Sequence, residues 1–341
     1  MLFSFLLAGF AAAGLGMDAP RCQQALDYSA GERGVAVLVL QHGEVICEGY
    51  ARGDSAAAHE LWSGTKSFLG IMAAAAVADG LMSLDEPAAL TLTEWADDPA
   101  RSAITIRHLL SMTSGHAGTI GRPPGYEAAL SAELMAAPGE RFVYSPVPSQ
   151  IFGEIMRRKL IAAGQEGDPV AYLRARVLDP AGIDIGGWRS GPDGHPLMPQ
   201  GALMTAREWA AFGEFVRHSA RVEDTPLVDP DTFEELFNGP QANPAYGLSW
   251  WMARATPATD PATASSDLPA HHETLPDDLV FAAGAGDQRL FVVPSQGLVI
   301  VRLARLDVAA LMAGERGNWS DYAFLSLWLD GVSTEDHGEA E

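Results

Sequence analysis

A serine and a lysine three residues apart are the strongest chemical signal in this sequence. Ser63 and Lys66 begin an apolar, alanine-rich run, SGTKSFLGIMAAAAVADG, and the chain has only one other lysine, Lys159. Positions i and i+3 lie on one face of a helix, so the hydroxyl and the amine are within reach of each other. Burial disfavours the charged form of an amine, and a neutral amine can accept the proton of an attacking serine. We therefore predict Ser63 as a nucleophile and Lys66 as its base.

A tyrosine on a loop is the second candidate. Tyr144 precedes a predicted helix that starts near Pro148. A phenol beside an ammonium can carry a proton between a nucleophile and a leaving group. Taken alone, the residue is better explained as an ordinary tyrosine that packs at the start of a helix.

A run of small residues is the third candidate. The sequence AGAGDQ, residues 283–288, leads into a predicted strand at 289–293, and small residues let a substrate approach the edge of a sheet closely. A backbone N–H of this edge and the N–H of Ser63 would form an oxyanion hole with two donors. The edge residues are Ala285, Gly286, Asp287 and Gln288. A plain glycine-rich turn is the alternative.

The order of the predicted elements gives the architecture. Two strands (35–40 and 44–50) are followed by helices at 63–80, 106–112, 147–163, 170–178 and 206–218, then by strands at 246–255, 279–283, 289–293 and 298–303 and a last helix at 319–329. This order predicts an α+β fold in which an antiparallel sheet, flanked by helices, is interrupted by a mostly helical subdomain. We expect a sheet subdomain of residues 20–62 and 244–331, a helical subdomain of residues 63–243 and an acidic tail at 332–341.

The composition limits the partners. The 341 residues include 22 basic and 44 acidic side chains, for a formal net charge of −22. Nucleic acids and anionic membranes attract basic surfaces, so neither is expected as a partner. Hydrophobic residues make up 48% of the chain, which is enough for a large core. The expected partner, a small molecule, follows from the chemical motifs and not from the composition.

The N-terminal region indicates export. Residues 2–16, LFSFLLAGFAAAGLG, are uncharged and apolar, so we expect a signal peptide over residues 1–19, a secreted or periplasmic location in a bacterial envelope, and no membrane span after its removal. Because no Lys or Arg precedes the apolar stretch, a buried N-terminal helix is the alternative. Cys22 and Cys47 are the only cysteines. They either form a disulfide, as an exported protein permits, or Cys47 is a buried free thiol.

No metal or cofactor is expected. The cysteines and histidines do not have zinc-site spacing, and His271, His272 and Glu273 fall within a stretch, 256–278, that is predicted as a solvated loop.

Taken in order, the three candidates resemble the motifs of the serine β-lactamase and penicillin-binding protein superfamily: SxxK, a YxN-type motif and a glycine-containing strand edge. Residues 81–87 (LMSLDEP), 106–115 (IRHLLSMTSG) and 201–209 (GALMTAREW) are similar to the branch that contains class C β-lactamases, D-alanyl-D-alanine peptidases, family VIII esterases and 6-aminohexanoate-dimer hydrolases. The resemblance covers about residues 30–330. It implies a β-lactamase/transpeptidase-like fold, with Ser63 as the acylated nucleophile, Lys66 as its base partner and Tyr144 as the proton shuttle.

Two departures from the family motifs bear on the substrate. Pro146 stands where the second motif usually has asparagine, and Ala285-Gly286-Asp287 stands where the third has Lys-Thr-Gly or His-Thr-Gly. The chain thus lacks a side-chain amide and a cation, and Asp287 would repel a substrate carboxylate. We expect a serine hydrolase that acts through an acyl-enzyme on esters or amides. The alternatives are a penicillin-binding D-alanyl-D-alanine peptidase or β-lactamase, which would take a β-lactam-like substrate, and a non-catalytic acyl-binding sensor.

Three tryptophans flank the predicted site elements. Trp62, Trp250 and Trp251 either line an apolar acyl pocket or pack in the core.

Overall fold

The computed structural model describes residues 11–12, 19–51, 57–118, 121–256, 266–309 and 317–330. Most of the expected signal peptide, residues 1–19, and the whole of the expected acidic tail, residues 332–341, lie outside the described residues. Within the described ranges, none of the helices has the length and apolar character needed to cross a membrane.

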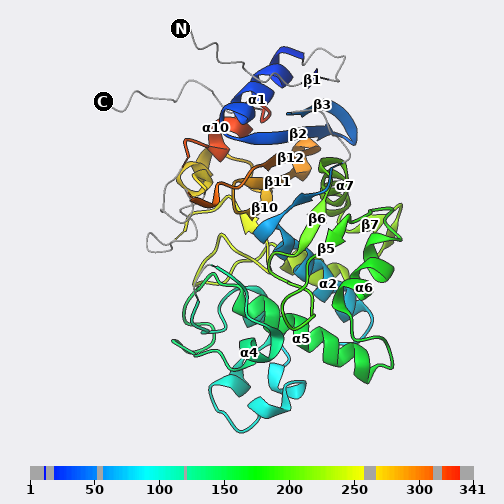
Figure 1. Cartoon of the computed structure of the whole chain (residues 1–341), viewed down its shortest axis with the longest axis vertical. Coiled ribbons are helices and arrows are strands. Elements are labelled where there is room, and N and C mark those ends of the chain that lie inside the picture. The colour runs from blue at the N-terminus through cyan, green and yellow to red at the C-terminus, as the bar shows by residue number, and fades with distance from the viewer. Residues whose placement is uncertain are drawn as a thin grey trace.

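A seven-stranded antiparallel sheet forms one half of the molecule (Figure 1). Its strands lie in the order β1-β3-β2-β12-β11-β10-β9, so β2 from the start of the chain pairs with β12 from its end. The strands are β1 (Ala11–Ala12), β2 (Gly34–Gln41), β3 (Glu44–Tyr50), β9 (Trp251–Met252), β10 (Val280–Gly284), β11 (Gln288–Val293) and β12 (Leu298–Ala304). The predicted N-terminal hairpin and the last three predicted strands are confirmed.

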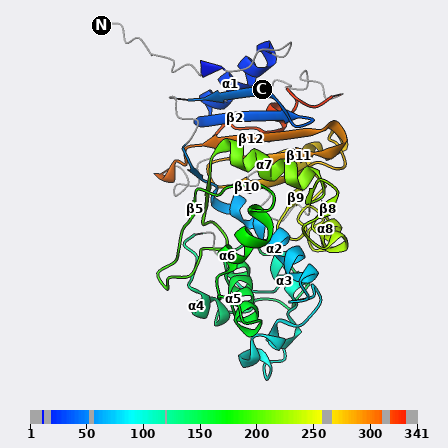
Figure 2. The same ribbon diagram turned by 90° about the vertical axis from the view of Figure 1, so that its right-hand side faces the viewer.

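The two faces of this sheet pack against separate cores. In β2, Val37 and Val39 belong to the core under α1 (Ala19–Gly31) and α10 (Asp321–Leu325), whereas Leu38 and Leu40 belong to the core under α7 (Ala206–Arg217). Successive side chains of a strand point to opposite faces. Figures 1 and 2 show α1 and α10 on one face and α7 on the other. Because both faces are covered, the strand is apolar at nearly every position.

The chain between β3 and β9 is mostly helical; α7 lies on the sheet, and most of the other helices lie at the far end of the molecule (Figure 2). Besides α7, it contains α2 (Ser67–Ala78), α3 (Ile106–Leu110), α4 (Tyr126–Leu130), α5 (Val147–Ala162), α6 (Pro169–Leu173), the π-helical turn η5 (Arg174–Leu178) and α8 (Pro230–Glu235). Residues 67–76 of α2 are all buried, as expected for a helix that is apolar all round. Helices and an antiparallel sheet together confirm the predicted α+β class.

Short elements complete the described chain. Small sheets are formed by β4 (His59–Glu60), β6 (Ala202–Met204) and β5 (Gly187–Trp188), and by β7 (Arg221–Val222) and β8 (Thr225–Pro226). Short 3-10 segments are η1 (Trp62–Lys66), η2 (Ala88–Leu90), η3 (Thr93–Trp95), η4 (Arg101–Ala103), η7 (Leu268–Thr274) and η8 (Pro294–Gln296).

Several boundaries differ from the sequence predictions. The helix predicted at 63–80 begins as the 3-10 turn η1, the strand predicted at 246–255 is reduced to β9, and the last helix is reduced to α10. The stretch predicted as a solvated loop contains η7, in which Leu268 is buried and the His271 ring stacks on Tyr322 at 3.9 Å. Residues 257–265 of that stretch lie outside the described residues. Contacts with distant segments of the chain order residues 268–274, and the composition alone does not reveal these contacts.

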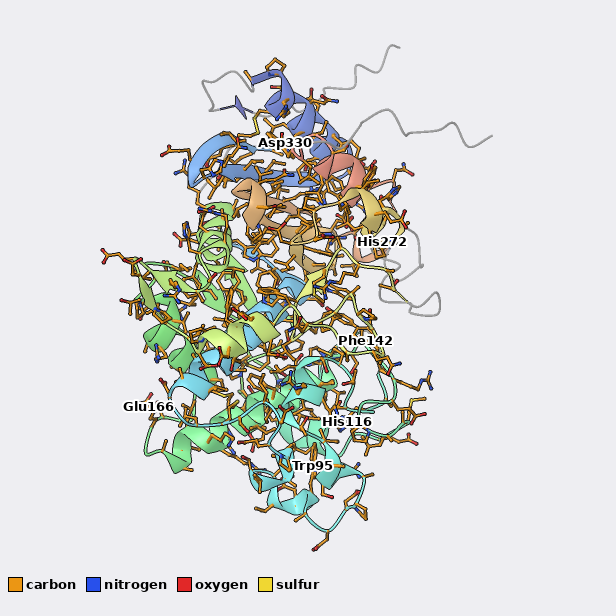
Figure 3. The ribbon with its side chains drawn as sticks, turned by 180° about the vertical axis from the view of Figure 1, so that it is seen from behind. Trp95, His116, Phe142, Glu166, His272 and Asp330 are labelled. Carbon is orange, nitrogen blue, oxygen red and sulfur yellow. A yellow bond between two sulfur atoms is a disulfide. The ribbon has the colours of Figure 1, made fainter. Side chains whose placement is uncertain are left out.

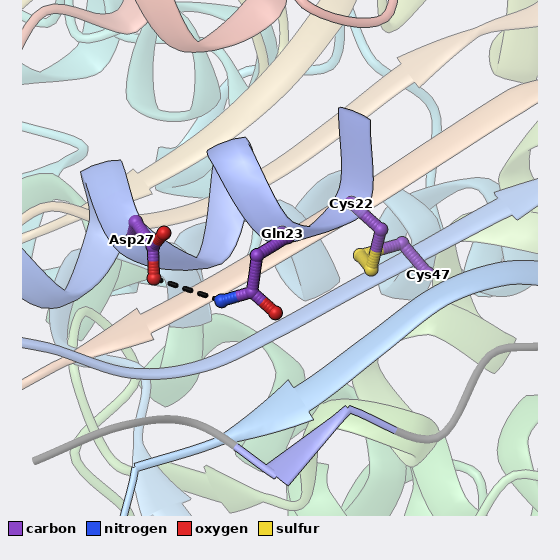
Figure 4. The surroundings of a disulfide bond; sticks show 4 residues. All are labelled: Cys22, Gln23, Asp27 and Cys47. Carbon is purple, nitrogen blue, oxygen red and sulfur yellow. Dashed lines mark hydrogen bonds between the residues drawn. A yellow bond between two sulfur atoms is a disulfide. The ribbon is translucent and has the colours of Figure 1, made fainter. Parts of the chain in front are cut away.

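A disulfide ties the N-terminal helix to the sheet. Cys22 of α1 and Cys47 of β3 are bridged, and both are buried (Figure 4). Of the two readings of these cysteines, the structure supports the disulfide.

Removal of this bridge is expected to destabilise the fold. The double substitution Cys22→Ala and Cys47→Ala should lower the free energy of unfolding by roughly 3 kcal/mol, because the bridge closes a loop between residues 25 apart. Urea denaturation of the double variant measures the change. Dithiothreitol should shift the wild-type midpoint to the same extent and leave the variant's midpoint in place. A variant with the wild-type midpoint would contradict the prediction.

A buried histidine makes the stability of the helical half depend on pH. His116 is 1% exposed, its Nδ1 lies 2.9 Å from Ser114 Oγ, and its ring is 5.9 Å from that of Trp95 (Figure 3). Burial, with a smaller contribution from the charge of Arg101, lowers the pKa of His116 to about 4. An unfolded histidine titrates near 6.5, so below that pH the unfolded chain binds the additional proton. Acid therefore destabilises the fold.

The wild-type protein should lose about 2 kcal/mol of stability from this residue alone between pH 7 and pH 5. In His116→Gln the free energy of unfolding should fall by about 2 kcal/mol less than in wild type between pH 7 and pH 5, as measured by urea denaturation at the two pH values. His218→Gln, at a side chain that is 59% exposed, is the matched control and should keep the wild-type loss. If His116→Gln and wild type lose the same stability, the ring does not cause the effect.

Candidate active site

The serine and the lysine of the first motif meet in the turn η1. Lys66 Nζ donates a hydrogen bond to Ser63 Oγ at 3.1 Å and another to the Pro199 carbonyl oxygen at 3.3 Å. A 3-10 turn aligns side chains i and i+3, so the tight turn itself brings the pair together. Lys66 is 4% exposed, whereas Ser63 is half-buried. Lys66 is thus enclosed, whereas Ser63 remains partly exposed.

Lys66 and the other lysine of the chain have different partners. Among the described residues, no carboxylate lies within ion-pair distance of Lys66, whereas the other lysine, Lys159, pairs with Glu86 at 2.5 Å. A lysine held by a carboxylate is a structural cation. Lys66 instead has a serine hydroxyl and a backbone carbonyl as its partners, so its amine contacts the Ser63 hydroxyl and not a counter-ion.

Tyr144 lies beside this pair, on the loop before α5. Lys66 Nζ is 4.5 Å from the centroid of the Tyr144 ring. The ring is enclosed by those of Trp251 at 5.4 Å, Tyr246 at 5.8 Å and Phe142 at 6.4 Å between centroids. These aromatic neighbours fix the plane of the phenol. A hydrogen bond from a catalytic group such as a tyrosine hydroxyl commonly shortens only when substrate is bound. The structure thus brings the three predicted residues Ser63, Lys66 and Tyr144 together.

The glycine-rich segment lies differently from the prediction. Ala285, Gly286 and Asp287 form the turn between β10 and β11 and are not a strand edge. Gly286 and Asp287 have φ values of +75° and +63°, which suit a tight turn. The side chain of Gln288 is buried and bonds the Ala304 backbone in both directions, at 2.7 and 2.8 Å. The observed role of Gln288 is therefore to link β11 to β12.

Gly284, the last residue of β10, is the residue of this hairpin that packs closely against η1, the turn that contains Ser63. A Cβ at Gly284 would lie 2.1 Å from the Leu61 carbonyl oxygen and 3.1 Å from the Gly64 nitrogen. No side chain fits there, so a glycine is required. The sequence placed the sheet edge one residue or more too late, because a run of small residues does not show where a strand ends and a turn begins.

The three tryptophans have different environments. Trp250 is fully buried and donates its Nε1 hydrogen to the Ser67 carbonyl oxygen at 3.1 Å, so it is a core residue. Trp251 packs against Tyr144. Trp62 is half-buried, directly precedes Ser63, and lies under the guanidinium of Arg189, 4.9 Å from its ring centroid.

Three residues around the site were not predicted from the sequence. Pro199, Arg189 and Tyr246 come from segments far from the SxxK motif, and no local pattern links them to it. No cluster of three His, Cys, Asp or Glu side chains that could hold a metal ion occurs in the part of the chain that the structure describes.

Known structures share this fold. The chain superimposes on a penicillin-binding protein homologue from Caulobacter crescentus with a TM-score of 0.66 at 16% identity, covering 87% of this chain and 94% of that one. A beta-lactamase from Mycobacterium bovis gives 0.59 at 21% identity, with 83% and 92% covered. EstCE1, a hydrolase with promiscuous acyltransferase activity, gives 0.62 at 16% identity, with 85% and 94% covered.

At such identities the solved structures establish the fold alone. No curated protein sequence matches the chain. The sequence model of the family described as Beta-lactamase, however, matches residues 19–318, which include η1, the Tyr144 loop and the β10–β11 hairpin. With this match over most of its length, the chain belongs to the beta-lactamase family.

Proposed function

We propose that this family member is a serine hydrolase that works through an acyl-enzyme, with esters as the favoured substrates and amides next. Ser63 Oγ attacks the substrate carbonyl, Lys66 accepts the serine proton, and Tyr144 passes a proton to the departing alcohol or amine. Water then cleaves the Ser63 ester, releases the acid and restores the hydroxyl. The observation that carries this proposal is the 3.1 Å contact between the amine of a buried lysine and the hydroxyl of a partly exposed serine.

Backbone N–H groups are the proposed donors to the oxyanion. One comes from Ser63 and the other from the end of the β10–β11 hairpin, residues 284–288. The close packing of Gly284 against the Leu61 carbonyl and the Gly64 nitrogen supports this assignment, because it brings the hairpin end next to the nucleophile turn. Donors fixed in this way stabilise the charge that develops in the transition state.

The site residues favour an uncharged substrate. Pro146 has no side-chain amide to offer, and the end of β10 reads Ala282-Ala283-Gly284, without a lysine or histidine. The nearest arginine on this hairpin, Arg289, is buried and bound to Asp321 at 2.9 Å. A substrate carboxylate would therefore lack the cation that positions it in relatives with Lys-Thr-Gly or His-Thr-Gly.

We also propose that the protein is exported to the periplasm or the medium. The Cys22–Cys47 bridge supports this, because disulfides persist in oxidising compartments. Fractionation of expressing bacteria, with the mature N-terminus read by mass spectrometry, tests it. A protein found only in the cytoplasm with reduced cysteines would contradict it.

Intact-mass spectrometry with a matched set of serine variants tests the hydrolase proposal. Wild type, Ser63→Ala and Ser67→Ala are each given a short-chain p-nitrophenyl ester and, separately, a fluorescent penicillin. We expect Ser63→Ala to lose turnover by roughly 10³-fold or more and to form no acyl adduct. Ser67→Ala removes a neighbouring hydroxyl that bonds the Gly64 carbonyl at 2.8 Å, and it should still be acylated.

The other outcomes separate the alternatives. A Ser63-dependent penicillin adduct with poor ester turnover would support the penicillin-binding alternative. A long-lived ester adduct without turnover would support a sensor. Turnover that persists in Ser63→Ala would show that the proposed nucleophile is wrong.

A further inference from the structure

The residue before the nucleophile has an unusual backbone conformation. Trp62 has φ +50°, in the left-handed region, which residues other than glycine rarely adopt. A glycine at this position would adopt the same conformation without strain. Backbone strain next to reacting groups points to a functional constraint at that position. The chain keeps a large indole at a place where its backbone favours glycine.

The indole is held in place by a fixed arginine. The Arg189 guanidinium lies 4.9 Å from the Trp62 ring centroid. Arg189 is itself fixed by Glu60 at 2.7 Å and by the Gln200 carbonyl oxygen at 3.2 Å. Pro199, the residue before Gln200, accepts a hydrogen bond from Lys66. One segment therefore supports both the indole ring and the proposed base.

The charge of this arginine is already balanced. Because Glu60 pairs with Arg189, the pair offers no unpaired charge to an ionic group of a substrate. What remains for a ligand is the Trp62 indole, which is half-buried and belongs to the residue directly before Ser63. A flat apolar surface of this kind stacks best with another flat apolar group.

We propose that Trp62, held by Arg189, is a specificity-determining residue that selects substrates with an uncharged aromatic ring next to the reacting carbonyl over substrates with short alkyl groups. This inference rests on the proposed hydrolase function and names the substrate class of that site. The ring of the substrate stacks on the indole while Ser63 attacks the carbonyl. The chemistry of acylation is unchanged.

Two matched pairs of esters test the selection. Methyl phenylacetate is compared with methyl butyrate, and benzyl acetate with butyl acetate, in a pH-stat. For Trp62→Gly, the ratio of kcat/KM for aromatic over alkyl should fall about fivefold to tenfold in at least one pair, mainly through KM. Trp62→Phe keeps a ring and should retain most of the ratio. Arg189→Gln leaves the ring without its support and should lose part of the ratio.

The outcomes distinguish this inference from the proposed function. If Trp62→Gly and Arg189→Gln lower all four rates by the same factor, Trp62 is structural and the selection does not exist. If Trp62→Gly does not fold, as judged by its melting curve, the ratios for Trp62→Phe and Arg189→Gln decide, and wild-type ratios in both would overturn the inference. If wild type shows no Ser63-dependent turnover of any ester, the proposed function fails and the inference fails with it.

Discussion

Replacing Lys66 by methionine should lower kcat for ester hydrolysis by roughly 10³-fold while the protein stays folded, because the substitution removes the proposed acceptor of the serine proton. Lys66 is 4% exposed and bonds Ser63 and the Pro199 carbonyl, so methionine fills most of its volume and loses only the polar contacts. Stopped-flow measurement of nitrophenol release, with the melting temperature as a check on folding, gives the result.

The other lysine is the matched control for this experiment. Lys159 on α5 pairs with Glu86 and bonds the Leu81 carbonyl at 2.9 Å, away from the nucleophile. Lys159→Met should lower the melting temperature and leave kcat within a few-fold of wild type. If Lys66→Met kept a tenth or more of the wild-type rate, another group would have to be the base, and the 3.1 Å contact would be structural.

The SxxK pair was predictable from sequence because its geometry is local. Two residues three apart in a turn must be neighbours, and an apolar helix that follows them must be buried. Tyr144 is different, because the sequence placed it on a loop but only the resemblance to a family placed it beside Lys66. The structure reports that contact at 4.5 Å, between segments that no periodicity connects.

The third motif shows the limit of sequence patterns. The run from Ala282 to Gly286 is uniformly small, so its sequence fits a strand, a turn or the boundary between them. Pairing settles the boundary, since Gly284 is opposite Gln288 in the ladder and residues 285–287 must then turn. The left-handed backbone of Trp62 and its contact with Arg189 depend in the same way on tertiary packing, which overrides local preference.

A buried ion pair behind the same hairpin should have the largest effect on stability. Asp321 of α10 is 1% exposed and accepts from Arg289 Nε at 2.9 and 3.0 Å and from Trp319 Nε1 at 2.6 Å. Asp321→Ala removes the main partner of a buried guanidinium and should lower the free energy of unfolding by about 3–5 kcal/mol. Urea denaturation at pH 7 measures the change.

Two further variants make this result specific. Asp85, whose side chain is 71% exposed, pairs with Arg107 at 2.7 Å, and Asp85→Ala should cost about 1 kcal/mol or less because surface pairs contribute little. The double substitution Arg289→Met and Asp321→Leu removes both charges and should recover much of the loss. A cost for Asp321→Ala as small as that of Asp85→Ala would contradict the prediction.

The same substitution should also affect the active site. Arg289 Nη1 donates to the Gln288 carbonyl at 3.1 Å and to the Gly284 carbonyl at 3.4 Å, so the guanidinium that Asp321 orients also holds the hairpin end that packs against the turn of Ser63. When that support is lost, the proposed oxyanion donor moves relative to the nucleophile. Asp321→Ala should therefore lose ester turnover at temperatures below its own melting transition. The Asp85→Ala variant should lose turnover only as it unfolds.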